Sequence, residues 1–176
     1  MAIISQRVPT MRMEASFPSV LNEPLTIRTY DPELDDVRSI LGDVCEWLEP
    51  HAEFVVSGFG QDRWPTDVRT DLLVLLEQLP GALHTLASGA PFEIDFYEQG
   101  IQRKVVFTPA EDAYLAKCLS YGTWEPNPAV ERIERDSLEA MLVMLREQFM
   151  RLLRMASPDL AEHPWIQSWL RGEFQF

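Results

Sequence analysis

The sequence predicts an α+β fold with a largely antiparallel sheet, a β-hairpin in its middle and a long C-terminal helix. Three observations lead to this fold class. Short segments with strand-like alternation are interleaved with amphipathic helical segments in the first half of the chain. Three strand-like segments then follow one another directly, which favours antiparallel pairing, and helical segments fill the C-terminal third. At 176 residues, the chain is long enough to bury the core of one domain.

The first half is predicted as strand, helix, strand, helix. The strand at 25–31, LTIRTYD, precedes a helix at 32–49 that Asp31 caps and that has Pro32 as its first helical residue. AEFVVSGFG is the second strand. The second helix begins near 65–67 and carries Asp67 and Asp71 near its positive end. It ends at Pro80-Gly81, with one or two further turns over ALHTLAS as the alternative. On the outer face of the first helix we expect an acidic set: Asp35, Asp36, Asp43, Glu46 and Glu49.

The middle segment FEIDFYEQGIQRKVVF predicts a hairpin with Gln99-Gly100 as a two-residue turn. Facing residues then have numbers that sum to 199. This register places Asp95 opposite Lys104, on the same face as Glu93 and Tyr97. The other face is apolar: Phe92, Ile94, Phe96, Ile101, Val105 and Phe107.

Residues 113–121 are predicted as a third consecutive strand, with a helix as the alternative. A helix from about 129 to 155 follows. A short helical segment follows, with Trp165 and Trp169 as packing residues. Residues 1–20 are a candidate disordered leader, because Met11 and Met13 are alternative start sites to Met1. Residues 21–176 are then a single α+β domain.

Composition predicts a cytoplasmic protein. The N-terminus lacks the features of a secretory signal, and no apolar run approaches the roughly 18 residues of a membrane span. The two cysteines, Cys45 and Cys118, provide neither a disulfide framework nor a zinc ligand set, which favours a reducing compartment.

Charge is concentrated in the middle of the chain. The formal net charge is −13, and the stretch from Asp31 to Glu98 alone holds 15 acidic residues against three arginines, a net charge of −12. Such a field repels nucleic acid and attracts a basic protein.

The stretch SGFGQDRWPTDVRTDL, from Ser57 to Leu72, raises the question of a phosphate-binding loop. Such a loop needs more glycine and usually a lysine, whereas Asp62 and Asp67 would repel phosphate. We therefore interpret Gly58 and Gly60 as a tight turn after a strand, with Trp64 packed beside it.

Catalytic chemistry has weak support. Asp67 and Asp71 share a helix face and Glu93 and Asp95 share a strand face, as in two-carboxylate hydrolases or Mg²⁺ sites, but a solvated acidic surface looks the same. His51, His84 and His163 have no ligand partner at helical spacing, and Cys118 is more simply a buried apolar thiol than part of a Cys–His pair. The sequence thus predicts a protein that is not an enzyme and has no metal or cofactor.

In size, acidity and lack of a catalytic motif, the chain resembles the immunity proteins of bacterial polymorphic-toxin and contact-dependent inhibition systems. That resemblance implies binding to a cognate basic toxin, such as a nuclease, and occlusion of its active site. Trp64 and Tyr97 are candidate aromatic anchors. The other candidate contact residues are acidic: Asp35, Asp36, Asp43, Glu46, Glu49, Asp62, Asp67, Asp71, Glu93 and Asp95. The alternatives are another acidic interaction or regulatory domain and a carboxylate hydrolase; the oligomeric state stays open.

Overall fold

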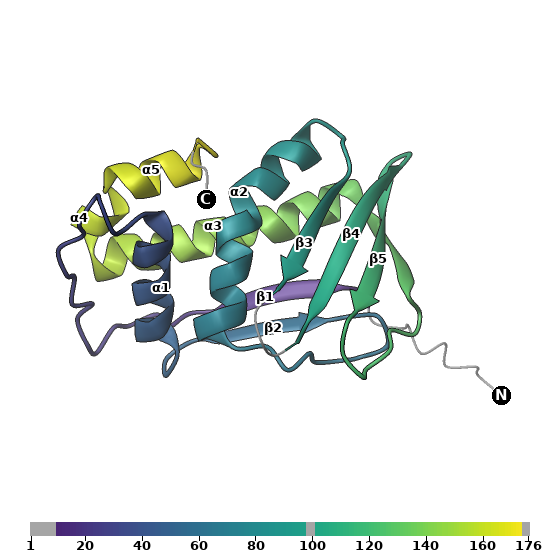
Figure 1. Ribbon diagram of the computed structural model, residues 1–176, viewed down its shortest axis with the longest axis horizontal. Helices are drawn as coiled ribbons and strands as arrows, with labels where there is room; N and C mark the ends of the chain where they lie inside the picture. The colour runs from purple at the N-terminus through teal and green to yellow at the C-terminus, as the bar shows by residue number, and fades with distance from the viewer. Residues whose placement is uncertain (1–9, 98–100, 174–176) are drawn as a thin grey trace.

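The computed structural model describes residues 10–97 and 101–173, and over these residues the fold is α+β, as predicted. Figure 1 shows a twisted sheet on one side of the molecule and helices on the other. A two-stranded sheet, formed by β1 (Arg12–Ser16) and β2 (Glu53–Ser57), lies along the lower edge. The larger sheet has four antiparallel strands in sequential order: β3 (Phe92–Phe96), β4 (Arg103–Ala110), β5 (Ala113–Ser120) and β6 (Val130–Glu134).

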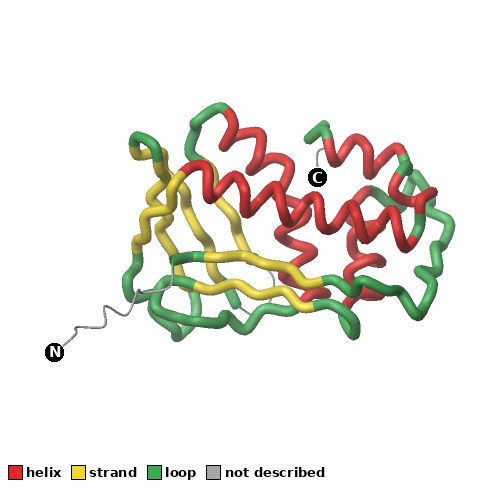
Figure 2. The backbone as a smooth tube through the Cα atoms, turned by 180° about the vertical axis from the view of Figure 1, so that it is seen from behind, coloured by secondary structure: helices red, strands yellow, loops and turns green. Residues whose placement is uncertain are grey.

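In the described part of the chain, five α-helices pack beside these strands or against one another. They are α1 (Val37–Leu48), α2 (Leu73–Ala87), α3 (Arg135–Ala156), α4 (Pro158–Ala161) and α5 (Pro164–Leu170), and one π-helical turn, η1 (Val68–Leu72), leads into α2. The long helix α3 crosses the whole molecule and contacts β1, β5, β6 and α2 (Figure 2). None of the described helices is long and apolar enough to cross a membrane.

The predicted hairpin register is confirmed. Phe92 pairs with Phe107 and Asp95 pairs with Lys104, so facing numbers sum to 199. Ile94, Phe96, Val105 and Phe107 are buried, and Phe92 stacks on Phe107. The expected turn at Gln99-Gly100 lies outside the described residues. The third consecutive strand is also confirmed, as β5.

The prediction of a disordered leader over residues 1–20 is wrong for its second half. Residues 12–16 form β1, which pairs antiparallel with β2 from Arg12↔Ser57 to Ser16↔Glu53. Met11, Met13 and Ala15 alternate along this segment and are all buried. The alternation is visible in the sequence, but its partner strand lies about 40 residues away, so no local pattern identifies it.

The first predicted strand is also wrong, because residues 25–31 have no partner strand. Arg28 and Tyr30 in this segment instead bind α1 through their side chains. The helix begins at Val37 rather than at Pro32, since residues 31–35 form a separate turn closed by Asp35 N–H to Asp31 C=O, 2.7 Å. Asp36, not Asp31, is the N-cap, and it forms a capping box with Ser39.

Helix α2 continues through Pro80 to Ala87, although the sequence predicts its end at Pro80-Gly81. A proline inside a helix removes the N–H that would bond to the carbonyl four residues earlier. Here that carbonyl belongs to Leu76, and it accepts a hydrogen bond from the indole Nε1–H of Trp169 in α5, 2.8 Å. The tertiary contact thus satisfies the group that the proline leaves without its helical donor.

The long helix starts at Arg135 rather than near residue 129, because residues 130–134 form β6. Their burial alternates strictly, with Glu131 and Ile133 inside and Val130, Arg132 and Glu134 exposed. They pair with β5 from Lys117↔Val130 to Ala113↔Glu134. The helical prediction extended the apolar spacing of α3 over a segment whose period is that of a strand.

Candidate protein-binding surface

The predicted acidic residues lie on elements that adjoin one another on the side that faces the viewer in Figure 1. Helix α1 contacts η1 and α2, and α2 contacts β3. The acidic surface consists of the predicted acidic residues from Asp35 to Glu49 on and beside α1, of those in the segment from Asp62 to Asp67, and of those on β3. Its members differ in exposure and pairing, and these differences decide which of them can meet a partner.

One network holds the N-terminal part of this surface. The Arg28 guanidinium donates two bonds to the Asp35 carboxylate, 2.8 and 2.9 Å, and a third to Asp43 Oδ2, 2.8 Å. The Tyr30 hydroxyl also donates to Asp43, and the Asp31 amide donates to Asp35. Hydrogen bonds from Arg28 and Asp31 lower the pKa of Asp35 well below its usual range.

In this network, Arg28 of the same chain neutralises much of the local negative charge. The Asp35 side chain is only 13% exposed, and Arg28 lies over the Tyr30 ring at 4.5 Å from its centroid. Burial and the bond to Asp43 raise the pKa of Tyr30. Asp35 and Asp43 therefore order residues 28–35 on α1, and they are less available to a partner than the sequence suggests.

The centre of the surface is more open. Glu46 on α1 pairs with Arg69 on η1 at 3.0 Å, with both side chains mostly exposed, so the pair links the two elements. Asp36, Glu49, Asp62 and Asp67 are exposed. Within the part of the chain that the structure describes, neither Glu49 nor Asp62 pairs with a basic side chain. These residues, with Glu46, are the part of the predicted set that geometry leaves accessible.

Two predicted contact residues are not at the surface. Trp64 is 1% exposed and packs against Phe59, Phe96 and Trp124, so the prediction of an aromatic anchor there is wrong. Asp71 is 4% exposed and accepts the Asp67 amide, 2.8 Å. The Asp67 carboxylate in turn accepts the Thr70 amide as the cap of η1. These two acids stabilise the start of a helix, as their position near its positive end favours.

One cation, Lys104, neutralises much of the negative charge where the acidic surface reaches β3. Lys104 lies 3.0 Å from Glu93 and 3.1 Å from Asp95, as the register predicts, and both contacts raise its pKa. Tyr97 is half-exposed, and its hydroxyl donates to the buried carboxylate of Glu77, 2.5 Å. Tyr97 remains an accessible aromatic side chain beside the acidic strand.

The glycine-containing turn has a structural role. Gly58, Phe59 and Gly60 all have positive φ, and a Cβ at Gly60 would collide with the carbonyl of Asn127. The Phe59 amide, which a phosphate loop would direct at its ligand, donates instead to the Glu131 carboxylate, 2.6 Å. Glu131 is buried and also accepts the Met11 amide, 2.5 Å. This carboxylate thus joins β6 to the start of β1 and to the turn.

Arg103 is a second buried charged residue that sequence reasoning missed. Its guanidinium lies against the rings of both Trp64 and Trp124, 4.6 and 3.7 Å from their centroids, and donates to Gln61 Oε1, 2.7 Å. Burial lowers the pKa of Arg103. The signal was present in the sequence, because Arg103 occupies an inward position between Ile101 and Val105. Cation–π contacts and one amide make this burial tolerable.

Two histidines and both cysteines have identifiable environments in the structure. Among the described residues, no group of three or more histidine, cysteine or carboxylate side chains could hold a metal ion. The His163 imidazole caps α5 by accepting the Trp165 amide, 3.2 Å, and His51 lies 3.6 Å from Glu23. Cys45 and Cys118 are both buried thiols, and burial raises the pKa of Cys118 to about 11, which disfavours the reactive thiolate.

Comparison with known proteins gives no relative: no family model, curated protein or solved structure matches this chain.

Proposed function

We propose that this protein is a cytoplasmic binding protein of the immunity type, which neutralises a basic toxin domain by covering its active site. The observation that carries the proposal is the accessible acidic centre formed by Asp36, Glu46, Glu49, Asp62 and Asp67 on α1 and the segment before η1. Two ordered elements present these carboxylates, so little conformational entropy is lost when a cationic surface meets them.

The proposed role of the acidic surface is to attract the partner electrostatically. Exposed charges at the rim of an interface mainly accelerate association, whereas a few buried contacts supply most of the affinity. A basic nuclease presents a cationic substrate site, and an anionic protein is steered toward it through the same field that attracts nucleic acid. Tyr97, half-exposed beside β3, remains the aromatic contact proposed for the affinity.

Binding rather than chemistry is the proposed mode of action. The polar groups that could have suggested a reaction are engaged in the fold, since Asp67 and Asp71 accept backbone amides, Glu93 and Asp95 pair with Lys104, and Cys118 is buried. A protein that acts only by binding needs no reactive group, which is compatible with this arrangement.

The experiment is a growth assay combined with co-purification. The product of the reading frame adjacent to this gene is expressed in bacteria with and without this chain. We expect the neighbour to inhibit growth alone, growth to recover when this chain is present, and a one-to-one complex to co-purify. A neighbour that is harmless, or whose toxicity and binding are unaffected by this chain, would contradict the immunity proposal.

A further inference from the structure

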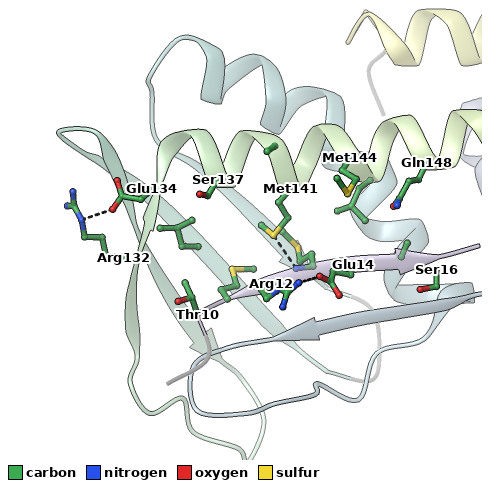
Figure 3. Close-up of a pocket in the computed structure, with 16 residues that line it drawn as sticks. Thr10, Arg12, Glu14, Ser16, Arg132, Glu134, Ser137, Met141, Met144 and Gln148 are labelled. Atoms are coloured by element: carbon green, nitrogen blue, oxygen red, sulfur yellow. Dashed lines mark hydrogen bonds and ion pairs between the residues drawn. The ribbon is translucent and has the colours of Figure 1, made fainter. Parts of the chain in front are cut away.

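A long groove lies between β1 and α3 (Figure 3). Its main cavity measures about 740 Å³ and is lined by β1, by the end of β6 and by one face of α3. A second cavity of about 460 Å³ shares Ala15, Ser16 and Gln148 with the first and extends to Arg151 and Met155. The two cavities adjoin along β1 and the segment that follows it, and together they are called the groove.

One wall of this groove is the free edge of β1, which pairs with β2 on its other side only. Met13 faces Val56 and Ala15 faces Phe54. The Val56 carbonyl accepts a hydrogen bond from the Trp64 amide, 2.7 Å, and the Phe54 carbonyl accepts one from Thr66 Oγ1, 2.9 Å. Both carbonyls therefore point away from β1.

In an antiparallel pair, directly opposed residues either point their N–H and C=O groups toward each other or both point them away. Met13 and Ala15 therefore direct their backbone groups toward the groove, at the two-residue spacing that a further strand requires. Side chains of α3 cover this edge, since the two residues are only 1% and 6% exposed.

These backbone groups have weak partners or none in the groove. The Met13 amide donates to the thioether sulfur of Met141, 3.2 Å, and sulfur is a poor acceptor. Among the described residues, none accepts from the Ala15 amide on this side. An edge of this kind is a template for pairing with another extended chain.

The opposite wall is apolar and adaptable. Figure 3 shows Met141 and Met144 projecting from α3 over the groove, and Ala140 and Leu145 line it as well. Met144 is 59% exposed. Methionine side chains are flexible and polarisable, and they are common on surfaces that adapt to bound peptides. Displacement of the Met141 thioether would free the Met13 amide for a better acceptor.

The charges around the groove differ from those of the rest of the protein. In the main cavity, Arg12 pairs with Glu14 and Arg132 pairs with Glu134, so the lining is neutral although the chain carries −13. In the second cavity Arg151 is the only charged lining residue, and no described carboxylate pairs with it. A segment with a carboxylate at that end of the groove complements this arrangement.

From these observations we propose that the groove binds an extended peptide segment of another protein, which adds to β1 as a third strand. Alternate side chains of the peptide lie against Met141 and Met144, and an acidic side chain or the C-terminal carboxylate lies at Arg151. Along α3 from Ser137 to Met155 the groove is roughly 27 Å long, which accommodates about eight extended residues. Because α3 packs directly against the edge, one extended chain enters only when the α3 side chains over β1, Met141 among them, move aside, and the edge of a folded sheet does not fit.

The probe for this proposal is a phage-displayed library of random dodecapeptides, selected on the immobilised full chain. We expect enrichment of peptides that alternate apolar and polar residues and carry an acidic residue or a free carboxylate near one end. Synthetic versions of the enriched peptides are then titrated against the wild-type chain and its variants. Bound peptide should slow hydrogen exchange at the amides of Met13 and Ala15, which a side-chain contact alone would not do.

Two variant pairs locate the binding. Met144→Glu should weaken binding about tenfold or more, whereas Leu115→Glu, at a side chain 40% exposed on β5, should leave it unchanged. Arg151→Glu should weaken binding of acidic-ended peptides, whereas Arg154→Glu, the same charge change outside the groove, should not.

Three results would overturn the proposal: no enriched peptide, equal effects of variant and control, or unchanged exchange at Met13 and Ala15. A dimer of this chain that Met144→Glu abolishes would also overturn it, in favour of a second copy as the occupant.

Discussion

At the scale of single residues, buried polar groups hold distant segments of the chain together. The Glu131 carboxylate accepts the amides of Met11 and Phe59, which lie 120 and 72 residues away in the sequence. Arg103 fills an inward position of β4 by lying against two indole rings. Spacing alone places Arg103 on the inward face, but the partners of both residues come from segments that only the fold brings together.

Glu131→Gln should lower the free energy of unfolding by about 1–3 kcal/mol, the cost of leaving a buried group unsatisfied. A carboxamide can accept one of the two amides through its oxygen, but its NH₂ group would face the other donor. Glu134→Gln, at an exposed position of the same strand, is the matched control and should change stability little. Urea denaturation of both variants measures the difference, and equal effects would show that Glu131 does not join these segments.

Asp35→Asn should destabilise the protein in a pH-dependent way. Because Arg28 and the Asp31 amide lower the folded-state pKa of Asp35, its contribution is fully present above the unfolded value of about 3.9 and is lost as pH falls below it. The gap in thermal stability between wild type and variant should therefore be largest near neutral pH and close in acid. A gap that stays constant between pH 7 and pH 3, about one unit below that value, would contradict this reading of the network.

At the scale of elements, the sequence predicts what is determined locally. The β3–β4 register was predictable because apolar alternation and the Asp95–Lys104 pair select the same alignment. Strand β1 was missed because its partner is distant, and the segment at 25–31 was overpredicted because Arg28 and Tyr30 bind α1 instead of a strand. The acidic surface was predictable from helical spacing, but the burial of Trp64 and Asp71 was not.

Helix α2 provides a test of how a tertiary contact overrides a local stop signal. Trp169→Phe removes the indole donor to the Leu76 carbonyl and should destabilise the protein by about 1–3 kcal/mol. In a Pro80→Ala background the helix regains its own donor to that carbonyl, so the same change should cost less. A double-mutant cycle measured in urea gives the coupling. Strictly additive effects would mean that the indole does not compensate for the proline.

At the scale of the whole molecule, two surfaces of different character lie on opposite sides. Helix α1, which carries much of the acidic surface, is on the near side in Figure 1, and β1 and α3, which line the groove, are on the near side in Figure 2. In our account the first steers a basic partner, and the second captures an extended segment. The surfaces share no residue, so variants can separate the two activities.

The most direct test of the proposed inhibitory function is the association rate with the cognate partner, measured at low and high ionic strength. The double variant Glu46→Lys and Glu49→Lys changes the accessible acidic centre, and Glu139→Lys with Glu147→Lys makes the same charge change on α3. We predict that the α1 variant associates markedly more slowly at low salt, that the difference shrinks at high salt, and that the α3 control stays close to wild type. Equal rates for the two folded variants would contradict the claim that this acidic surface guides the partner.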